Sequence, residues 1–306
     1  MIHTLIISHA LIQHQDGVSL HPDLFAWQAS LAAYKQTWFE CADKNPLAWY
    51  AALCDQSPTR LLAGQCDALP QDASQYWVVS PYHATVARSN VRVYPEGLFP
   101  CSADDAAWLC GALNPLLAED GMVLCAVGSA LLLACQQPMD ARPLGFGAIS
   151  GQRLPGCDHE GADGGRLNRL LSEIQMLLFQ HPSPSRQERG EVDVNGLWFW
   201  APVDSCDHTD ATSIAVATRN PALQSIVDGQ DATVMITEVE RLHELLKAEM
   251  PLPKCIVLAG AGHAVLLKKS ILPTFGKRQW KATLKKRHPA SKLFSMLHSQ
   301  KRNHAA

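Results

Sequence analysis

Residues 167–200 have the sequence LNRLLSEIQMLLFQHPSPSRQERGEVDVNGLWFW, which contains the clearest helix pattern of the chain. Pro182 and Pro184 end a helix predicted over 166–180, because proline lacks the backbone donor that a helix needs. The following run, Val192–Trp200, places large apolar side chains on both faces and predicts a core strand. The helix is amphipathic, with one apolar stripe made by Leu167, Leu170, Leu171, Ile174, Leu177 and Leu178.

Further elements flank this stretch on both sides. The β-branched run at 2–7 (IHTLII) predicts a buried strand of a parallel sheet. Later strands are predicted over 213–218, 233–237, 255–259 and 263–269, and helices over 22–39, 46–54 and 238–249. Because strands and helices alternate, we expect an α/β fold with a mainly parallel sheet flanked by helices.

The middle of the chain predicts a smaller α+β unit. Strands are expected over 76–80 and 91–95, and Ser102 with Asp105 predicts a capping box for a helix over 103–117. A Gly-Ser link joins the apolar runs 122–127 and 130–135, which is typical of a β-hairpin. Residues 57–74 and 136–166 are expected to be connections. We therefore predict a discontinuous core, 1–70 and 166–306, with 76–165 as an inserted domain.

The composition is that of a globular protein. The chain has 306 residues, of which 47% are hydrophobic and 18% charged, and two domains are expected at this length. There is no apolar run of about 18 residues that would span a bilayer, so no membrane contact is expected. The first residues, MIHTLIISHALIQHQDG, lack the basic region and cleavage site of a signal peptide, which predicts a cytoplasmic protein.

Ten cysteines are spread along the chain without a metal-binding or disulfide pattern. None forms Cys-x-x-Cys, and several, such as Cys110, Cys125 and Cys255, lie within apolar runs. A thiol in such a run behaves as a small hydrophobic side chain. We interpret the cysteines as reduced core residues.

Other motifs give little support for a cofactor or a metal. The glycine-rich stretches 145–151 and 260–265 lack the strand–glycine–helix context of a phosphate-binding loop. The run Asp207-His208-Thr209-Asp210 offers oxygen and nitrogen ligands, but neighbouring residues of an extended segment point to opposite sides. We therefore predict no cofactor and no metal ligand.

Charge is strongly segregated along the chain. After Glu249 there are twelve Lys or Arg residues and no acid, so this segment carries +12 and the preceding residues −15. Two short basic helices are predicted over 277–287 and 291–300, with inward-facing apolar residues at Trp280, Leu284, Leu293, Phe294 and Leu297. The segment is a candidate surface for a polyanion or nucleic acid; alternatively, it docks on the protein's own acidic body. The candidate anion-binding residues are Lys277, Arg278, Lys281, Lys285, Lys286 and Arg287.

The stretch 167–200 resembles the return segment of the archaeal-type cofactor-independent phosphoglycerate mutases. There a helix beginning Leu-Asn leads to His-Pro, arginines, a glycine and Asn-x-x-Trp-x-Trp, and the matching residues here are Leu167, Asn168, His181, Pro182, Arg186, Arg189, Gly190, Asn195, Trp198 and Trp200. The run Ser172–Pro182 is more similar still to bacterial proteins of the RpfE type, named for regulation of pathogenicity factors. The resemblance implies an alkaline phosphatase-like core with two metal ions at the strand ends and a serine or threonine nucleophile.

The catalytic residues that the resemblance implies are not found. The family's first strand ends in a metal-binding Asp followed by Gly, whereas strand 2–7 continues into Ser8-His9. The family's nucleophile loop is Pro-Gly-Ser-Asp, whereas the helix at Pro46 follows Asp43-Lys44-Asn45. The late Asp-His-Ser has no counterpart after Glu249. Two-metal catalysis needs these hard ligands, so we expect a catalytically silent relative with a regulatory or binding role.

Four polar residues of the resembling stretch are candidate ligand-binding residues. His181, Arg186, Arg189 and Asn195 are brought together by the motif and could bind a phosphorylated small molecule, or serve an enzyme with a rearranged site. The alternative is that they brace the junction between the inserted unit and the core. His181, next to Pro182, is also placed to complement the helix dipole.

Overall fold

The chain divides into two compact units in the computed structural model, which describes residues 2–70, 72–87, 90–155, 159–204, 214–242, 252–269, 280–282 and 286–302. Unit 1 consists of residues 1–55, 213–220 and 227–306, and unit 2 of residues 56–212 and 221–226. Among the described residues, no helix combines the length and the apolar content that a membrane span requires.

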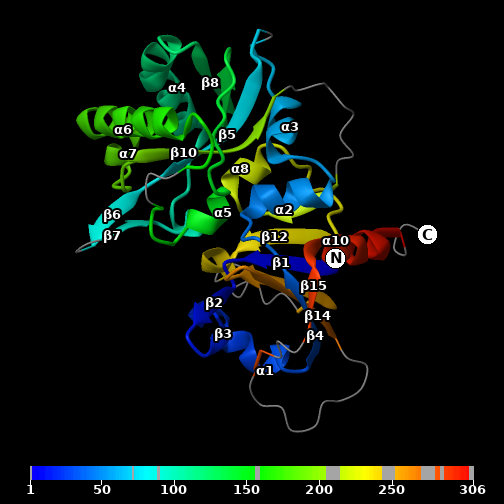
Figure 1. The fold of residues 1–306 in the computed structure, drawn as a ribbon. Helices are drawn as coiled ribbons and strands as arrows, with labels where there is room; N and C mark the ends of the chain where they lie inside the picture. The colour runs from blue at the N-terminus through cyan, green and yellow to red at the C-terminus, as the bar shows by residue number, and fades with distance from the viewer. Residues whose placement is uncertain are drawn as a thin grey trace. The chain divides into compact units, whose positions relative to one another are not determined.

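Unit 1 is built on a seven-stranded sheet with the order β11-β12-β1-β13-β14-β4-β15 (Figure 1). The pairs β11–β12, β12–β1, β1–β13 and β4–β15 are parallel, whereas β13–β14 and β14–β4 are antiparallel. The predicted α/β class with a mostly parallel sheet is therefore confirmed. The strands are β1 (Thr4–Ser8), β4 (Tyr34–Glu40), β11 (Val216–Thr218), β12 (Val234–Glu238), β13 (Cys255–Gly260), β14 (His263–Lys269) and β15 (Arg287–Pro289).

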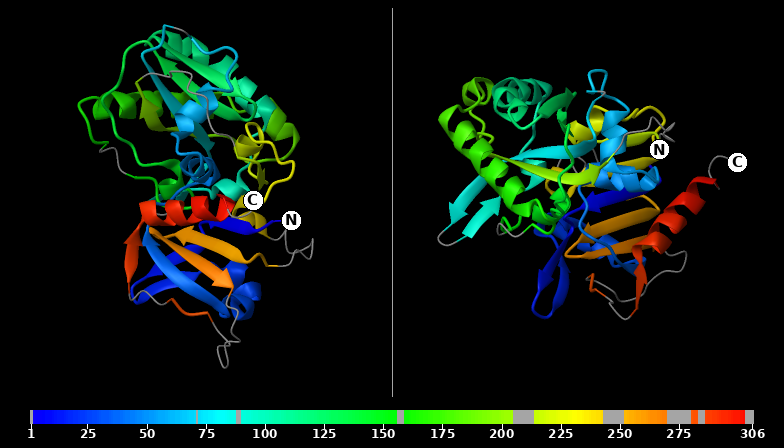
Figure 2. Two further views of the ribbon diagram at one scale, coloured as in Figure 1. Left: turned by 90° about the vertical axis from the view of Figure 1, so that its right-hand side faces the viewer. Right: turned by 45° about the horizontal axis from the view of Figure 1, so that its top comes forward.

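Helices flank this sheet. Helix α2 (Pro46–Leu53) contacts β12, and α10 (Ala290–Arg302) contacts both α2 and β4 (Figure 2). Asn45 begins α2, since its side chain accepts a hydrogen bond from the Ala48 backbone N–H at 3.0 Å. A cluster of buried apolar side chains joins the sheet to the N-terminal elements β2 (Leu11–His14), β3 (Gly17–Leu20), η1 (Pro22–Trp27) and α1 (Gln28–Leu31). The short η3 (Val239–Arg241) follows β12.

Unit 2 contains a four-stranded antiparallel sheet with the order β10-β5-β9-β8. Helices α4 (Ala103–Ala118) and α6 (Gly164–Gln180) lie beside this sheet (Figure 1), and they share a core of buried side chains with it. The strands are β5 (Gln75–Tyr82), β8 (Met122–Val127), β9 (Ala130–Cys135) and β10 (Gly196–Val203), with a separate hairpin of β6 (Ala84–Ala87) and β7 (Asn90–Val93). The helices are α3 (Pro58–Ala63), η2 (Glu96–Leu98), α4 (Ala103–Ala118), α5 (Phe146–Ile149), α6 (Gly164–Gln180), α7 (Pro184–Glu188) and α8 (Pro221–Gln224).

Most elements with a clear local signal occur where the sequence predicts them. Helix α4 has the predicted capping box between Ser102 and Asp105. The hairpin β8–β9 turns at Gly128, whose φ of +58° is the left-handed conformation that such a tight link requires. Helices α2 and α6 and the paired strands β13 and β14 are confirmed as well. Short-range chemistry therefore fixes these elements.

Three predictions about local structure are wrong. The predicted helix 22–39 ends at Leu31, and 34–40 is strand β4. This strand pairs with β14, and its aromatic side chains are buried. The connection 57–74 contains helix α3, begun by the Ser57 side chain and Pro58. The expected loop 136–166 contains α5.

The tryptophan strand lies in a different sheet from the one expected. Strand β10 pairs with β5 in the four-stranded sheet of unit 2, so it is not part of the core sheet. Its partners β5 and α6 bury the large side chains of β10, and the segment 166–204 thus belongs with 76–165 in one unit. The unit boundaries differ accordingly from the expected 1–70 and 166–306. An inserted domain in an alkaline phosphatase-like core stays a prediction.

Candidate functional site

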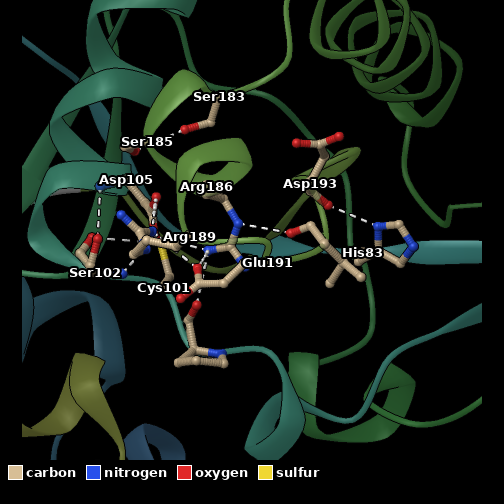
Figure 3. Close-up of polar contacts among 12 residues, drawn as sticks. His83, Cys101, Ser102, Asp105, Ser183, Ser185, Arg186, Arg189, Glu191 and Asp193 are labelled. Carbon is tan, nitrogen blue, oxygen red and sulfur yellow. Dashed lines mark hydrogen bonds and ion pairs between the residues drawn. The ribbon is translucent and has the colours of Figure 1, made fainter.

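Arg186, one of the four candidate ligand-binding residues, is buried in unit 2, where neighbouring protein groups hold its guanidinium (Figure 3). Its Nη1 donates to Asp105 Oδ2 at 2.8 Å and to the Pro100 carbonyl at 3.0 Å. Its Nε donates to the Val192 carbonyl at 2.8 Å, and its guanidinium lies 4.5 Å from the centre of the Phe99 ring. Helix α7 is thereby fixed to the N-terminus of α4.

Asp105 is the centre of this network. Its Oδ2 also accepts from the Ser102 backbone N–H at 2.9 Å, and its Oδ1 accepts from Arg189 Nη2 at 3.0 Å. Burial by itself would raise the pKa of Asp105, but hydrogen bonds from Ser102 and the nearby Arg186 and Arg189 lower the pKa below its ordinary value. Arg189 also pairs with Glu191 at 3.0 Å. We call Asp105, Arg186, Arg189 and Glu191 the arginine network.

The other two candidates differ from each other in their contacts. Asn195 Nδ2 donates to the Ala84 carbonyl at 2.8 Å, and its Oδ1 accepts from the Ala84 N–H at 2.7 Å, so its amide pairs with the open edge of β6. His181 is exposed at the end of α6, where its N–H donates to the Leu177 carbonyl at 2.9 Å. The contacts of Arg186, Arg189 and Asn195 are those of bracing residues. A ligand-binding role for the four stays a hypothesis.

A second group of polar side chains lies at the carboxyl ends of the parallel strands of unit 1. Ligands of open α/β sheets bind outside this edge. Ser8 and Glu238 are register partners at the ends of β1 and β12, and both are fully buried. Glu238 accepts from Asn220 Nδ2 at 2.6 Å and lies 3.6 Å from Arg241 Nε. Burial raises the pKa of Glu238 above its ordinary value, although Asn220 and Arg241 oppose this.

Three ionisable residues from separate elements meet at the same edge. His9 follows β1, Asp43 lies between β4 and α2, and His263 begins β14. Asp43 Oδ1 accepts from the Gly262 N–H at 3.0 Å; burial raises the pKa of Asp43, and the adjacent His9 and His263 oppose the increase. Burial and then Arg287 lower the pKa of His263, whereas Asp43 and Glu40 oppose this.

Several buried polar atoms at this edge have no hydrogen-bond partner among the described residues. They are Ser8 Oγ, Glu238 Oε2, Arg241 Nε and Nη2, and His263 Nδ1. Buried polar atoms are nearly always hydrogen-bonded in folded proteins, so a set at one edge calls for an explanation. We call Ser8, His9, Asp43, Glu238, Arg241 and His263 the carboxyl edge. The sequence does not reveal this edge, because a helix predicted through 34–39 conceals that Asp43 follows a strand.

The remaining motifs contribute no site geometry. Among the described residues, no three His, Cys, Asp or Glu side chains are grouped so that they could hold a metal ion, and Asp207–Asp210 lies outside those residues. Gly260, with φ of +149°, is in the β13–β14 turn, where a Cβ would lie 2.6 Å from the Leu11 carbonyl oxygen. This glycine therefore allows close packing against β2.

The basic segment is described only in part. Lys281, Lys286 and Arg287 are exposed, whereas Lys277, Arg278 and Lys285 lie outside the described residues. The predicted helix 291–300 corresponds to α10, with Leu293 and Leu297 buried as expected. The predicted helix 277–287 is not found where it is described, because 287–289 form β15; Leu284 lies outside the described residues. Likewise, the predicted helix 238–249 is described only to Leu242 and begins as the short η3.

Comparisons with known proteins give distant structural similarities. No family profile matches the sequence, and no curated protein matches it. A cofactor-independent phosphoglycerate mutase from Thermoplasma acidophilum is 12% identical over 98% of this chain and 100% of its own, with a TM-score of 0.36. The PH0037 protein from Pyrococcus horikoshii is 10% identical over 97% of each chain, with a TM-score of 0.42. At these values neither similarity carries a conclusion about site or chemistry.

Proposed function

We propose that this chain is a phosphoglycerate mutase-like protein that binds a ligand in a regulatory role and does not catalyse the mutase reaction. The sequence supports the architecture through the ordered match of Leu167–Trp200, including the RpfE-type run at Ser172–Pro182. The proposal assigns ligand binding to the carboxyl edge of unit 1. There, polar and ionisable side chains come together with buried polar atoms that have no hydrogen-bond partner within the part of the chain that the structure describes.

Two residues support the proposed loss of mutase chemistry. At the end of β1, where the resemblance implies a metal-binding carboxylate, the chain has the buried hydroxyl of Ser8. At the start of α2, where it implies a nucleophile, Asn45 is engaged in capping the helix. A two-metal site stabilises charge on the attacking and the leaving oxygen together, and neither residue replaces a carboxylate ligand in that task.

A second candidate function is an enzyme with a rearranged site at the same edge. The observation that favours it is the meeting of His9, Asp43 and His263: both histidines act to lower the pKa of Asp43, and Asp43 acts to raise that of His263. Perturbed ionisable groups at strand ends are a feature of catalytic sites, although structural clusters show it as well. This candidate uses general acid–base chemistry by a histidine next to a carboxylate.

The binding role is tested by a thermal-shift screen of the full chain against phosphorylated metabolites, including 3-phosphoglycerate, with and without Mn²⁺. We expect at least one compound to raise the melting temperature, because His9, His263 and Arg287 supply positive charge or donors at the edge. The variant His263→Ala is expected to abolish this increase, and the exposed control His181→Ala to retain it. An increase that depends on His181 and persists in His263→Ala would place the ligand at the resembling stretch of unit 2 and contradict the assignment.

A further inference from the structure

Three cysteine side chains from separate parts of unit 2 form a cluster. Cys66 lies in the turn after α3, Cys110 is on α4, and Cys125 is on β8. The three thiols lie close enough to affect one another's ionisation: Cys66 contributes to the raised pKa of Cys110, and Cys66 and Cys110 both contribute to that of Cys125. These residues are far apart in the sequence, and their spacing gave no sign of the cluster.

The fold explains how the three thiols come together. Helix α4 runs beside the edge strand β8, since Asn114 Nδ2 donates to the Leu124 carbonyl at 3.1 Å and its Oδ1 accepts from the Leu124 N–H at 2.7 Å. Cys110 is one helical turn before Asn114, and Cys125 follows Leu124, so both lie at this edge. The Cys125 Sγ also donates to the Ala68 carbonyl at 3.9 Å, which brings the turn that carries Cys66 over β8.

We propose that Cys66 and Cys125 are a redox pair that forms a reversible disulfide when the protein meets a peroxide. Cys66 is partly exposed, whereas Cys125 is buried, with 8% of its surface exposed. A small oxidant therefore reaches Cys66 first. Cys125, which bonds to Ala68 two residues after Cys66, is the sulfur that resolves the oxidised form.

The reaction balances with one peroxide molecule. The Cys66 thiolate attacks one peroxide oxygen and breaks the O–O bond; the released hydroxide takes up the thiol proton as water, and Cys66 becomes a sulfenic acid. The Cys125 sulfur then attacks the Cys66 sulfur, the S–S bond forms, and the sulfenic hydroxyl leaves with the Cys125 proton as a second water. Two thiols are oxidised by two electrons while hydrogen peroxide is reduced to two waters.

The environments of the other thiols agree with this order of events. Burial, together with neighbouring thiols, raises the pKa of Cys125 to about 12 and that of Cys110 to about 11. A thiol with a raised pKa is protonated at neutral pH and reacts slowly with peroxide in solution, whereas attack of Cys125 on the neighbouring oxidised Cys66 is intramolecular and needs no such encounter. Cys135 on β9 is fully buried, and its pKa is raised to about 12, so it is an internal reference that stays reduced.

The disulfide would join the turn after α3 to β8 and close a long loop of the chain. Restricting the unfolded chain in this way stabilises the folded unit, and the effect increases with loop length. We therefore expect the oxidised protein to melt at a temperature higher by roughly 5–15 °C, and dithiothreitol to reverse the change.

The experiment treats the full chain with a small excess of hydrogen peroxide, blocks the remaining thiols with N-ethylmaleimide and maps peptides by mass spectrometry without reduction. We expect a Cys66–Cys125 cross-linked peptide, with Cys135 unmodified by the oxidant. Cys66→Ser should abolish the cross-link and the rise in melting temperature, and the matched variant Cys110→Ala should keep both. A Cys66–Cys110 cross-link, or peroxide-treated protein in which Cys66 and Cys125 are both recovered as thiols, would overturn the proposal.

Discussion

The arginine network of unit 2 and the carboxyl edge of unit 1 are both rich in charged side chains, but they differ in how fully these are satisfied. In the network, Asp105 accepts hydrogen bonds from Ser102, Arg186 and Arg189, and Arg186 also donates to two carbonyl groups. At the edge, Ser8, Glu238 and His263 each retain a buried polar atom without a hydrogen-bond partner among the described residues. The comparison separates charge that builds the fold from charge to which we assign a ligand in our proposal.

This difference also changes the meaning of the sequence match. The residues of the resembling stretch that first suggest a ligand, Arg186 and Arg189, are held by an acid on another helix. A buried ion pair whose hydrogen bonds are complete gives specificity to packing and leaves few donors for a ligand. The arginines of the resembling stretch therefore have contacts that stabilise the fold.

The largest expected effect is on stability, from Asp105→Asn. This variant removes the charge that both arginines require and leaves Arg186 buried without its partner, which should cost about 3–5 kcal/mol of unfolding free energy. The control is Asp104→Asn, an exposed neighbour in the same first turn of α4, expected to change stability by less than about 0.5 kcal/mol. Urea unfolding measures both. Equal midpoints for the two variants would show that the network does not stabilise unit 2.

The next effect concerns pH, with opposite signs in the two regions. Because the folded-state pKa of Asp105 is below its ordinary value, its contribution to stability is present above about pH 4 and is lost as the pH falls through the folded pKa. Because the folded-state pKa of Glu238 is raised, the folded protein holds that proton more tightly, and stability declines as the pH rises from about 4.3 through the folded pKa.

The isosteric change Glu238→Gln separates the pH-dependent stability that comes from Glu238 from that which comes from Asp105. The amide keeps an oxygen for Asn220 and removes the buried charge, so we expect stability at pH 7 to stay within about 1 kcal/mol of the parent protein. The decline with rising pH should be smaller in Glu238→Gln and unchanged in Asp104→Asn. Urea unfolding at several pH values provides the measurement. A steeper decline in Glu238→Gln would mean that the carboxyl is stabilised in its charged form.

A smaller effect distinguishes bracing from ligand binding inside the resembling stretch. Asn195→Ala removes two hydrogen bonds to Ala84 and is expected to lower the unfolding free energy by roughly 1–2 kcal/mol. The exposed His181→Ala should change it by less than about 0.5 kcal/mol. Thermal unfolding with matched protein concentrations suffices for this test. A loss in His181→Ala as large as in Asn195→Ala would show that the helix end is held by this histidine.

The smallest effect is expected from the basic C-terminal segment. Exposed Lys286 and Arg287 predict weak binding to duplex DNA that falls between about 50 and 200 mM salt, because each neutralised phosphate releases counterions. The double variant K286A/R287A should reduce the salt dependence by about two phosphate contacts, and the control Lys35→Ala should reduce it less. Fluorescence anisotropy gives the slopes. No binding at low salt would indicate that the basic segment instead docks on the acidic residues of the same chain.

The sequence predicted the elements whose signal is local and missed what depends on distant pairing. The Ser102–Asp105 capping box, the Gly128 turn and the stripe of α6 are each set by a few neighbouring residues, and all three are found. Tyr34–Glu40 has apolar residues at a spacing that fits either a helix or a strand. Only pairing with β14 decides between them.

The candidate sites show the same limit. Arg186 and Arg189 could be picked out from the sequence. Their ion pairs with Asp105, about eighty positions earlier, could not. It found the ten cysteines, but not that Cys66, Cys110 and Cys125 meet at one edge of a sheet. His9, Asp43 and His263 follow or begin strands that are adjacent only in the folded sheet, so their meeting depends on strand order.

The central claim is a mutase-like architecture without mutase chemistry. The most direct test is elemental analysis of the purified full chain together with a coupled assay for the interconversion of 2- and 3-phosphoglycerate in the presence of Mn²⁺. Because β1 ends in Ser8 and Asn45 is used to cap α2, the account predicts no stoichiometric divalent metal and no turnover above the assay background. Two metal equivalents per chain, with turnover abolished by replacing a single serine or threonine, would contradict it and establish the chain as an enzyme.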